Sequence, residues 1–258
     1  MQDFLAKQHL KDRMISDLRI AEGLSRKLST EDVVTIVDSG YAVELLCSKK
    51  FSRFHHDLDL ILICKDTSIL SDKLVLDSMS SLVDNICWIS LNTAPTWIWL
   101  RELEYKQKET PRQINIKIIK LKEYDRSLSE IEVISTNGQE YRIPLVTVNS
   151  NLHGGKVSEF LVPDVNWQCA TKLRLMEYYT KDYQIRESDK HDFTFLLKHS
   201  NFHIDKVVEY LADYYNKKRS IASTTAHSKA LGTFLSLLKK HPSISPKNLK
   251  ILISKTEK

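Results

Sequence analysis

Apolar and polar residues follow different periods along the first half of the chain. Between residues 3 and 28, apolar residues recur three to four apart among charges, which predicts one or two amphipathic helices. The runs VVTIV at 33–37 and LDLILI at 58–63 are short and rich in aliphatic residues, which favours strands. INIKIIKL at 114–121 alternates apolar and polar residues, as a half-exposed strand does. This half of the chain therefore mixes helices with strands.

The rest of the chain is predicted to form further helices and strands up to Pro163 and helices alone beyond it. Helices are expected at 41–49 and about 68–84, a strand at 85–91, and a hairpin at 131–146 around Asn137-Gly138, whereas 96–106 is ambiguous. The segment from His153 to Lys156 is interpreted as a turn. Beyond Pro163 the strand pattern ends, and helices are expected at about 164–181, 188–199, 203–217, 223–240 and 246–254. The predicted fold is α/β (α+β) over 1–160, including N-terminal helices in 1–30, followed by a helical domain over 161–258.

Composition narrows the class of protein. The chain has 258 residues, 42% of them hydrophobic, enough for a sizeable core. A net charge of +5 without a dense basic stripe argues against a nucleic-acid partner. No run approaches the roughly 20 apolar residues that span a bilayer, and the N-terminus has no signal-peptide pattern. The cysteines occur without CxxC pairs, which indicates reduced thiols. We expect a cytoplasmic protein without a membrane partner.

Two neighbouring motifs carry candidate chemistry. Ser39-Gly40 lies between a predicted strand and a predicted helix, where free backbone N–H groups can bind a phosphate. Asp57 and Asp59 are two apart on a predicted strand, so their carboxylates share a face. Such a pair can hold Mg²⁺, which prefers oxygen ligands and substrate phosphates. The order of these motifs predicts a site for a nucleoside triphosphate.

The stretches SGYAVELL and RFHHDLDL together resemble the nucleotidyltransferase superfamily, and within it the aminoglycoside and lincosamide nucleotidyltransferases. The segment Arg186 to Asp192 resembles a helix that follows the catalytic domain in that family. The resemblance covers about residues 33–198 and implies a mixed sheet with flanking helices, followed by a helical region. It also implies transfer of a nucleoside monophosphate from an NTP such as ATP to a hydroxyl of a small molecule, with an antibiotic-like acceptor as one possibility.

The resemblance also assigns roles to individual residues. Asp57 and Asp59 would be catalytic and hold Mg²⁺, and Ser39 and Gly40 would cradle the triphosphate. The other candidates for nucleotide binding are Arg53, His55, Lys172 and Lys190. The first two of these would contact phosphates or anchor the loop before the strand. The acids that flank Lys190, at 189 and 192, are expected to form salt bridges or cap contacts.

One position departs from the family pattern. A third carboxylate is expected on the strand at 114–121, but Asn115 occupies the corresponding place and Lys117 follows on the same face. An amide cannot act as a carboxylate base. Three glutamates are candidates to replace that acid: Glu102, Glu104 and Glu123.

Three hypotheses therefore stand. The first is a Mg²⁺-dependent nucleotidyltransferase acting on a small molecule. The second is a catalytically degenerate nucleotide-binding or protein-interaction module of the same fold, which Asn115 favours. The third is an enzyme that nucleotidylates a protein or a tRNA end, and the mild charge argues against tRNA.

Overall fold

The computed structural model divides the chain into two compact units, Met1–Pro163 and Asp164–Lys258. It describes residues 2–29, 32–47, 52–53, 55, 57–67, 72–80, 82, 86–90, 99–107, 110–125, 129–134, 138, 140–153, 156–179, 185–218 and 221–240. The predicted boundary at residues 160 and 161 lies inside a strand of the first unit, described below, and each unit is described by itself.

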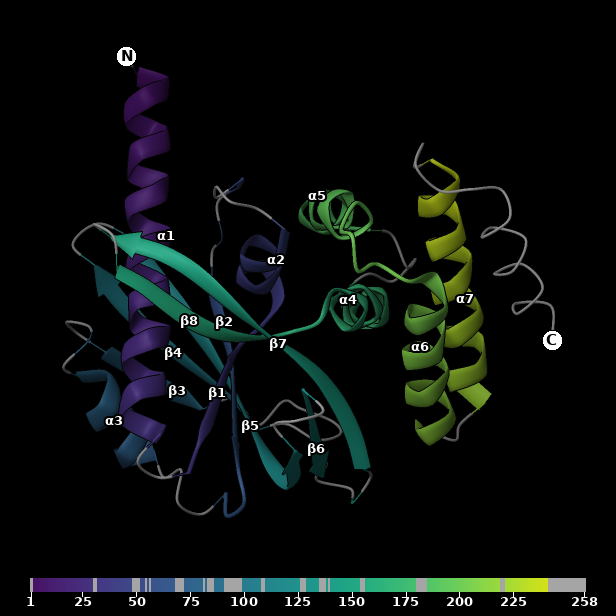
Figure 1. The fold of residues 1–258 in the computed structure, drawn as a ribbon, viewed down its shortest axis with the longest axis horizontal. Helices are drawn as coiled ribbons and strands as arrows, with labels where there is room; N and C mark the ends of the chain where they lie inside the picture. The colour runs from purple at the N-terminus through teal and green to yellow at the C-terminus, as the bar shows by residue number, and fades with distance from the viewer. Residues whose placement is uncertain are drawn as a thin grey trace. The chain divides into compact units, whose positions relative to one another are not determined.

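The first unit contains three helices and eight strands among the described residues. The helices are α1 (Gln2–Leu28), α2 (Ser39–Cys47) and α3 (Asp72–Ser80). The strands are β1 (Val34–Val37), β2 (Asp57–Cys64), β3 (Ile86–Ser90), β4 (Trp99–Gln107), β5 (Thr110–Asp125), β6 (Glu130–Ile134), β7 (Glu140–His153) and β8 (Lys156–Pro163). Figure 1 shows the long helix α1 beside the strands of this unit.

These strands form one sheet in the order β2-β1-β8-β7-β6-β5-β4-β3, and β2 also pairs with β5. The second pairing joins the two ends of the run from β2 to β5 into a closed ring of six strands. Two neighbouring pairs, β1 with β8 and β2 with β5, are parallel. The expected mixed sheet with flanking helices is therefore present, but its closure into a ring was not predicted.

Helices cover one face of β2 and β5. Leu58, Leu60 and Leu62 of β2 belong to a single buried cluster with residues of α1, α2 and α3. Ile114, Ile116 and Ile118 of β5 belong to the same cluster. Because successive strand residues point to opposite faces, the odd-numbered residues of both strands lie on the other face. That face is polar at the start of each strand and apolar further along, where Ile61, Ile63 and Ile119 are buried.

The turn predicted at His153 to Lys156 lies between two strands and not before the helical half. The register pairs His153 of β7 with Lys156 of β8, and the two strands run antiparallel. The strand β8 was not predicted. The sequence pattern concealed this strand because Val157 is 54% exposed while Ser158 is buried. The usual rule of apolar residues inside and polar residues outside is inverted at its start. The ambiguous stretch 96–106 overlaps β4, which begins at Trp99.

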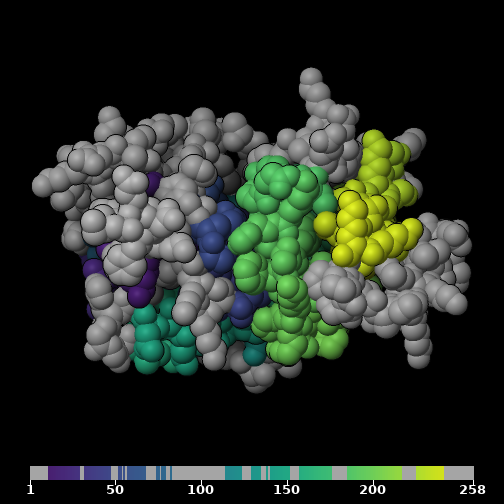
Figure 2. Space-filling view, turned by 90° about the horizontal axis from the view of Figure 1, so that it is seen from above, coloured from purple at the N-terminus to yellow at the C-terminus, as the bar shows by residue number. Residues whose placement is uncertain are grey.

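The described part of the second unit is helical, as the sequence predicted. It contains α4 (Val165–Tyr179), α5 (Glu187–Leu196), α6 (Ile204–Lys218) and α7 (Ile221–Lys239). The described atoms of α7 form a yellow patch in the space-filling view of Figure 2. The fifth predicted helix, at 246–254, lies outside the described residues. No helix within the described ranges is long and apolar enough to cross a membrane.

Candidate functional site

The parallel pairing of β2 with β5 brings the two predicted carboxylates beside Asn115. The register aligns Asp59 with Asn115 and Asp57 with Gln113. Asp57 and Asp59 share the face of β2 that the helices leave uncovered, because the intervening Leu58 belongs to the helix-covered core. The structure thus places Asn115 next to the carboxylate pair, at the position where the sequence resemblance expects a third acid.

The side-chain amide of Asn115 links the two carboxylates. Its Nδ2 donates to Oδ2 of Asp57 at 3.2 Å and to Oδ1 of Asp59 at 2.9 Å. Its Oδ1 is buried and accepts no hydrogen bond from the described residues. A primary amide has two donor hydrogens and one acceptor oxygen. Both hydrogens of the donor group are therefore used, while the acceptor oxygen has no partner in the described part of the chain.

Negative charge accumulates at this face. Burial raises the pKa of Asp59 to about 6, and the neighbouring charges of Asp57 and Asp38 act in the same direction. The charge of Lys117 and the hydrogen bond from Asn115 oppose this rise. A bound divalent cation would relieve the repulsion, because an opposite charge a few ångströms away favours the ionised carboxylate.

A third aspartate, Asp38, which the sequence analysis missed, joins the site through Lys117. Nζ of Lys117 lies 3.0 Å from Oδ2 of Asp38, and both side chains are largely buried. The backbone N–H of Asp38 donates to the carbonyl oxygen of Asp59 at 2.9 Å. The available signal was an acid that ends the apolar run at 33–37, directly before Ser39.

The Ser39-Gly40 turn begins α2 directly after β1. Ser39 has a φ of +56°, a left-handed conformation that L residues rarely adopt. A Cβ on Gly40 would lie 2.3 Å from Nδ1 of His55 and 2.9 Å from a terminal nitrogen of Arg53. Gly40 is therefore required for the close approach of the loop before β2. The turn brings together four of the predicted nucleotide-binding residues.

A buried glutamate that the sequence analysis did not single out, Glu44 of α2, holds this loop. Its carboxylate accepts hydrogen bonds from Oγ of Ser52 at 2.6 Å, from the backbone N–H of Ser52, and from that of Arg53 at 3.3 Å. It also lies 3.3 Å from Nε2 of His55. Burial opposes the charge, but the hydrogen bonds from His55 and Ser52 outweigh it and lower the pKa of Glu44.

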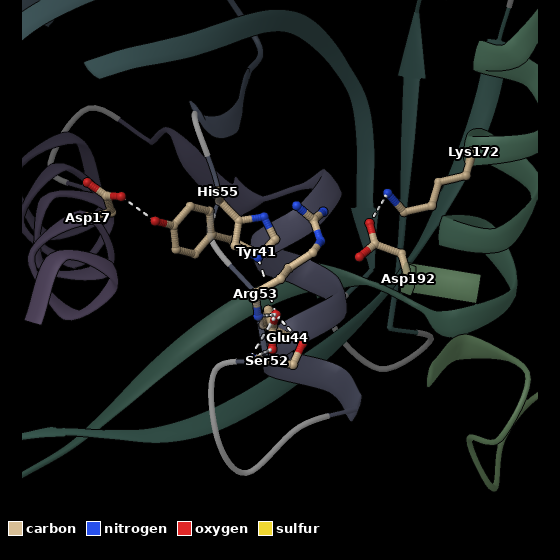
Figure 3. A network of polar contacts seen from close by, with 8 residues as sticks. All are labelled: Asp17, Tyr41, Glu44, Ser52, Arg53, His55, Lys172 and Asp192. Atoms are coloured by element: carbon tan, nitrogen blue, oxygen red, sulfur yellow. Dashed lines mark hydrogen bonds and ion pairs between the residues drawn. The ribbon is translucent and has the colours of Figure 1, made fainter. Parts of the chain in front are cut away.

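His55 is packed as an anchor. It is 4% exposed, and its ring lies 4.8 Å from that of Tyr41, centroid to centroid. The hydroxyl of Tyr41 donates to the buried carboxylate of Asp17 on α1. Figure 3 follows this network from Asp17 through Tyr41 and His55 to Glu44. Of the two roles expected for His55, the geometry accounts for loop anchoring.

The two predicted lysines belong to the second unit. Nζ of Lys172 lies 2.7 Å from Oδ2 of Asp192 and 3.6 Å from Oδ1 of Asp189, and all three side chains are buried. Asp189 also accepts from Nε of Arg186 at 2.6 Å, so both aspartates form the expected salt bridges. Lys190 is half exposed and pairs with Glu187 at 2.5 Å. The assignment of both lysines to nucleotide binding stays a prediction.

The register separates the three candidate replacements for the missing acid. The backbone of Glu102 on β4 is directly opposite Asn115, and that of Glu104 is opposite Gln113. Glu123 is exposed and lies eight residues beyond Asn115 on β5, about 26 Å along a strand at 3.3 Å per residue. Glu123 is therefore too far away to replace the acid.

A metal centre made only of protein ligands is not found among the described residues. No group of three or more histidine, cysteine, aspartate or glutamate side chains within them is arranged to hold a metal ion. Mg²⁺, however, usually binds to one or two carboxylates and completes its shell with substrate phosphates and waters. The pair of Asp57 and Asp59 fits that donor set.

A scan against protein-family models and a search of the curated proteins find no match to this chain. Among solved structures, JHP933 from Helicobacter pylori is similar at 13% identity and a TM-score of 0.46, over 95% of this chain and 94% of that one. A provisionally named nucleotidyltransferase from H. pylori has 14% identity and a TM-score of 0.44, over 95% and 96%. The CD-NTase CdnG of Bradyrhizobium diazoefficiens, solved with GTP, has 10% identity and a TM-score of 0.29, over 96% and 91%. At these scores the likenesses carry no argument.

Proposed function

We propose that the first unit is a Mg²⁺-dependent nucleotidyltransferase that moves a nucleoside monophosphate from an NTP to a hydroxyl of a small molecule. The observation that carries the proposal is that Asp57, Asp59 and Asn115 share one face of the paired strands β2 and β5, and that the Ser39-Gly40 turn begins α2, the helix before β2. Carboxylates for a cation and a backbone turn for phosphates are the two parts that nucleotidyl transfer needs.

Asp57 and Asp59 would hold the cation. Their donor set suits Mg²⁺, and burial together with the neighbouring charges of Asp57 and Asp38 raises the pKa of Asp59, a rise that a bound cation would oppose. When bound, the cation supplies charge neutralisation to the triphosphate and to the attacking oxygen.

Ser39 and Gly40 would receive the phosphates. The first backbone N–H groups of a helix lack intrahelical partners and attract anions. Gly40 leaves that turn without a side chain, and a terminal nitrogen of the Arg53 guanidinium lies 2.9 Å from where its Cβ would be. The absence of a side chain at Gly40 and the positive charge of Arg53 beside it favour a phosphate at the start of α2.

The reaction is an in-line substitution. The acceptor oxygen forms a bond to the α-phosphorus, the bond from that phosphorus to the bridging oxygen breaks, and pyrophosphate leaves. The proton of the hydroxyl must pass to a base, which Asn115 cannot provide. Glu102, whose backbone is paired with that of Asn115, is the candidate we favour among the predicted replacements. Loss of a general base is typically worth about 10²–10⁴-fold in rate.

ATP is the first donor to test, and aminoglycoside and lincosamide alcohols are the first acceptors, because the motif resemblance points to them. The resemblance concerns the nucleotide site and not the acceptor pocket, so the screen should extend to other small polyols. Fold relatives do not determine the substrate.

Asn115 favours one alternative, a nucleotide-binding or protein-interaction module that has lost its catalytic acid. The two functions differ in turnover and not in nucleotide binding. An Asn115→Asp variant separates them, since an inactive wild type that gains pyrophosphate release through this change would identify a degenerate enzyme.

The first test is calorimetry of a non-hydrolysable ATP analogue with and without Mg²⁺. We expect Mg²⁺-dependent binding by the wild type and its loss in the double variant Asp57→Asn/Asp59→Asn. Wild-type protein that binds no nucleotide under any of these conditions refutes the proposed function.

Pyrophosphate release with each acceptor is the second test. Activity that survives Asp59→Asn would show that the chemistry lies elsewhere. Activity unchanged by Glu102→Gln would remove that residue from the role of base while leaving the metal pair in place.

A further inference from the structure

The side-chain amide of Asn115 has hydrogen-bond partners for its nitrogen but, among the described residues, none for its oxygen. Nδ2 lies within hydrogen-bond distance of both carboxylates, 3.2 Å from Asp57 and 2.9 Å from Asp59. Oδ1 is buried and has no partner among the described residues. Leaving a buried acceptor unsatisfied typically costs about 1–3 kcal/mol, and such groups in native proteins call for an explanation.

The observed orientation of the amide is the one that two neighbouring carboxylates favour. The amide hydrogens carry partial positive charge and lie between two carboxylates that repel each other. With the amide turned over, Oδ1 would face those same carboxylates, and oxygen lone pairs would oppose oxygen lone pairs. The preference for the observed orientation is therefore electrostatic and depends on what occupies the site.

A cation between Asp57 and Asp59 reverses that preference. The NH₂ group would then face a positive charge, whereas an amide oxygen is a ligand that hard cations accept. The orphaned Oδ1 is the oxygen that becomes available by rotation about the Cβ–Cγ bond, without movement of β5. The carbonyl thereby gains the partner that it lacks.

We propose that Asn115 is a reversible third ligand, whose amide bridges Asp57 and Asp59 when no cation is bound and turns its oxygen to a divalent cation when one binds. The proposal rests on the cation site of the proposed function, but it concerns metal binding alone and requires neither nucleotide nor turnover. It gives Asn115 a positive role where the family pattern has a carboxylate.

The sign of one substitution distinguishes this proposal from simple competition. If the amide only occupies the place of the cation, Asn115→Ala removes a competitor and leaves two unbridged carboxylates, so cation affinity rises. If the amide supplies Oδ1, the same variant loses a ligand and cation affinity falls. We expect a fall of about tenfold or more, because even residues that only orient the ligands of a metal site typically contribute about 10–100-fold to its affinity.

The experiment is titration of the full chain with Mn²⁺, followed by electron paramagnetic resonance of the free ion. Wild type, Asn115→Ala and Asn115→Asp are compared with Asn149→Ala, which removes an exposed amide on β7. We expect weaker binding for Asn115→Ala, tighter binding for Asn115→Asp and no change for the control. Equal or tighter binding by Asn115→Ala, or no Mn²⁺ binding by the wild type, overturns the proposal.

A measurement on the wild type removes the dependence on a variant that folds. The side-chain ¹⁵N–¹H₂ signals of Asn115, assigned by their absence from Asn115→Asp, should shift when Mg²⁺ is added, because both amide hydrogens leave their carboxylate acceptors. Signals that stay unchanged at saturating Mg²⁺ overturn the proposal. A protein that passes both tests but releases no pyrophosphate keeps this role for Asn115 and loses the proposed activity.

Discussion

Adding a single methyl group at Gly40 should disturb the loop that leads into the carboxylate strand. The Cβ of Gly40→Ala would lie 2.3 Å from Nδ1 and 2.6 Å from Cε1 of His55. Ordinary van der Waals contact begins at 3.4 Å, so the ring must retreat by about 1 Å. The ring has little room for this, because it lies 4.8 Å from Tyr41 and 3.3 Å from the carboxylate of Glu44.

The cost follows from these contacts. A shift of that size disturbs the geometry of the contact between Nε2 of His55 and the carboxylate of Glu44. Overpacking a core typically costs 1–3 kcal/mol and a weakened buried hydrogen bond about 1 kcal/mol more, so we expect a loss of about 2–4 kcal/mol in the free energy of unfolding. Nucleotide affinity should fall as well, because Asp57 follows His55 by two residues.

Urea unfolding of the full chain, followed by circular dichroism, measures this loss. Gly232→Ala is the matched control, since its Cβ would meet nothing within 4 Å and the residue lies inside α7. Alanine in a helix interior should stabilise by about 0.5–1 kcal/mol relative to glycine. A double-mutant cycle with His55→Ala should show coupling, because the added methyl group then has no ring to displace. A Gly40→Ala protein as stable as the wild type would refute the packing argument.

Three further predictions concern the charged groups. Glu44→Gln should destabilise the protein by about 1.5–3 kcal/mol at neutral pH. Since the folded pKa of Glu44 is lowered, its contribution is present above the ordinary value of 4.5 and is lost as pH falls through the folded pKa, so urea midpoints of variant and wild type should converge in acid. Lys172→Met should lower the free energy of unfolding by about 3–5 kcal/mol, because two buried carboxylates lose their ammonium partner. Lys190→Met should change the free energy of unfolding by less than about 1 kcal/mol, because its ion pair is exposed. Equal effects of the two variants would contradict the burial argument. Asp57→Asn should lower the pKa of Asp59 from about 6, as measured by carboxylate ¹³C shifts, and an unchanged pKa would show that the charge of Asp57 does not contribute to the rise.

Local pattern made part of this site predictable. The apolar run at 58–63, with Asp59 inside it and Asp57 directly before it, predicted β2 and the shared face of the two carboxylates, because side-chain alternation is a property of a single strand. Counting along β5 by the same rule placed Asn115 and Lys117 on one face. These are statements about a strand in isolation, and the register between β2 and β5 agrees with them.

Non-local pairing made the rest unpredictable. Asp38 joins the site through Lys117, which is far along the chain and lies 3.0 Å away, and through the hydrogen bond from its backbone N–H to Asp59. In the sequence, Glu44 resembles any solvent-exposed glutamate of a helix. In the structure its carboxylate accepts hydrogen bonds from Ser52 and Arg53, in the loop before β2. The closure of the ring depends on the β2–β5 pairing, which no local period encodes.

The residues around the site divide into those that would touch substrate and those that position them. Asp59 is held by pairing with β5 on one side and by the N–H of Asp38 on the other. Asp57 is held on one side by β5 and on the other by a loop that Glu44 and His55 fix to α2. Because the same helix α2 also begins with the proposed phosphate-binding turn, movement of this loop would change the distance between the proposed cation ligands and that turn. The contacts of Glu44 and His55 therefore set that distance. Variants of these two residues should weaken Mg²⁺-dependent nucleotide binding more than they weaken binding of Mn²⁺ alone.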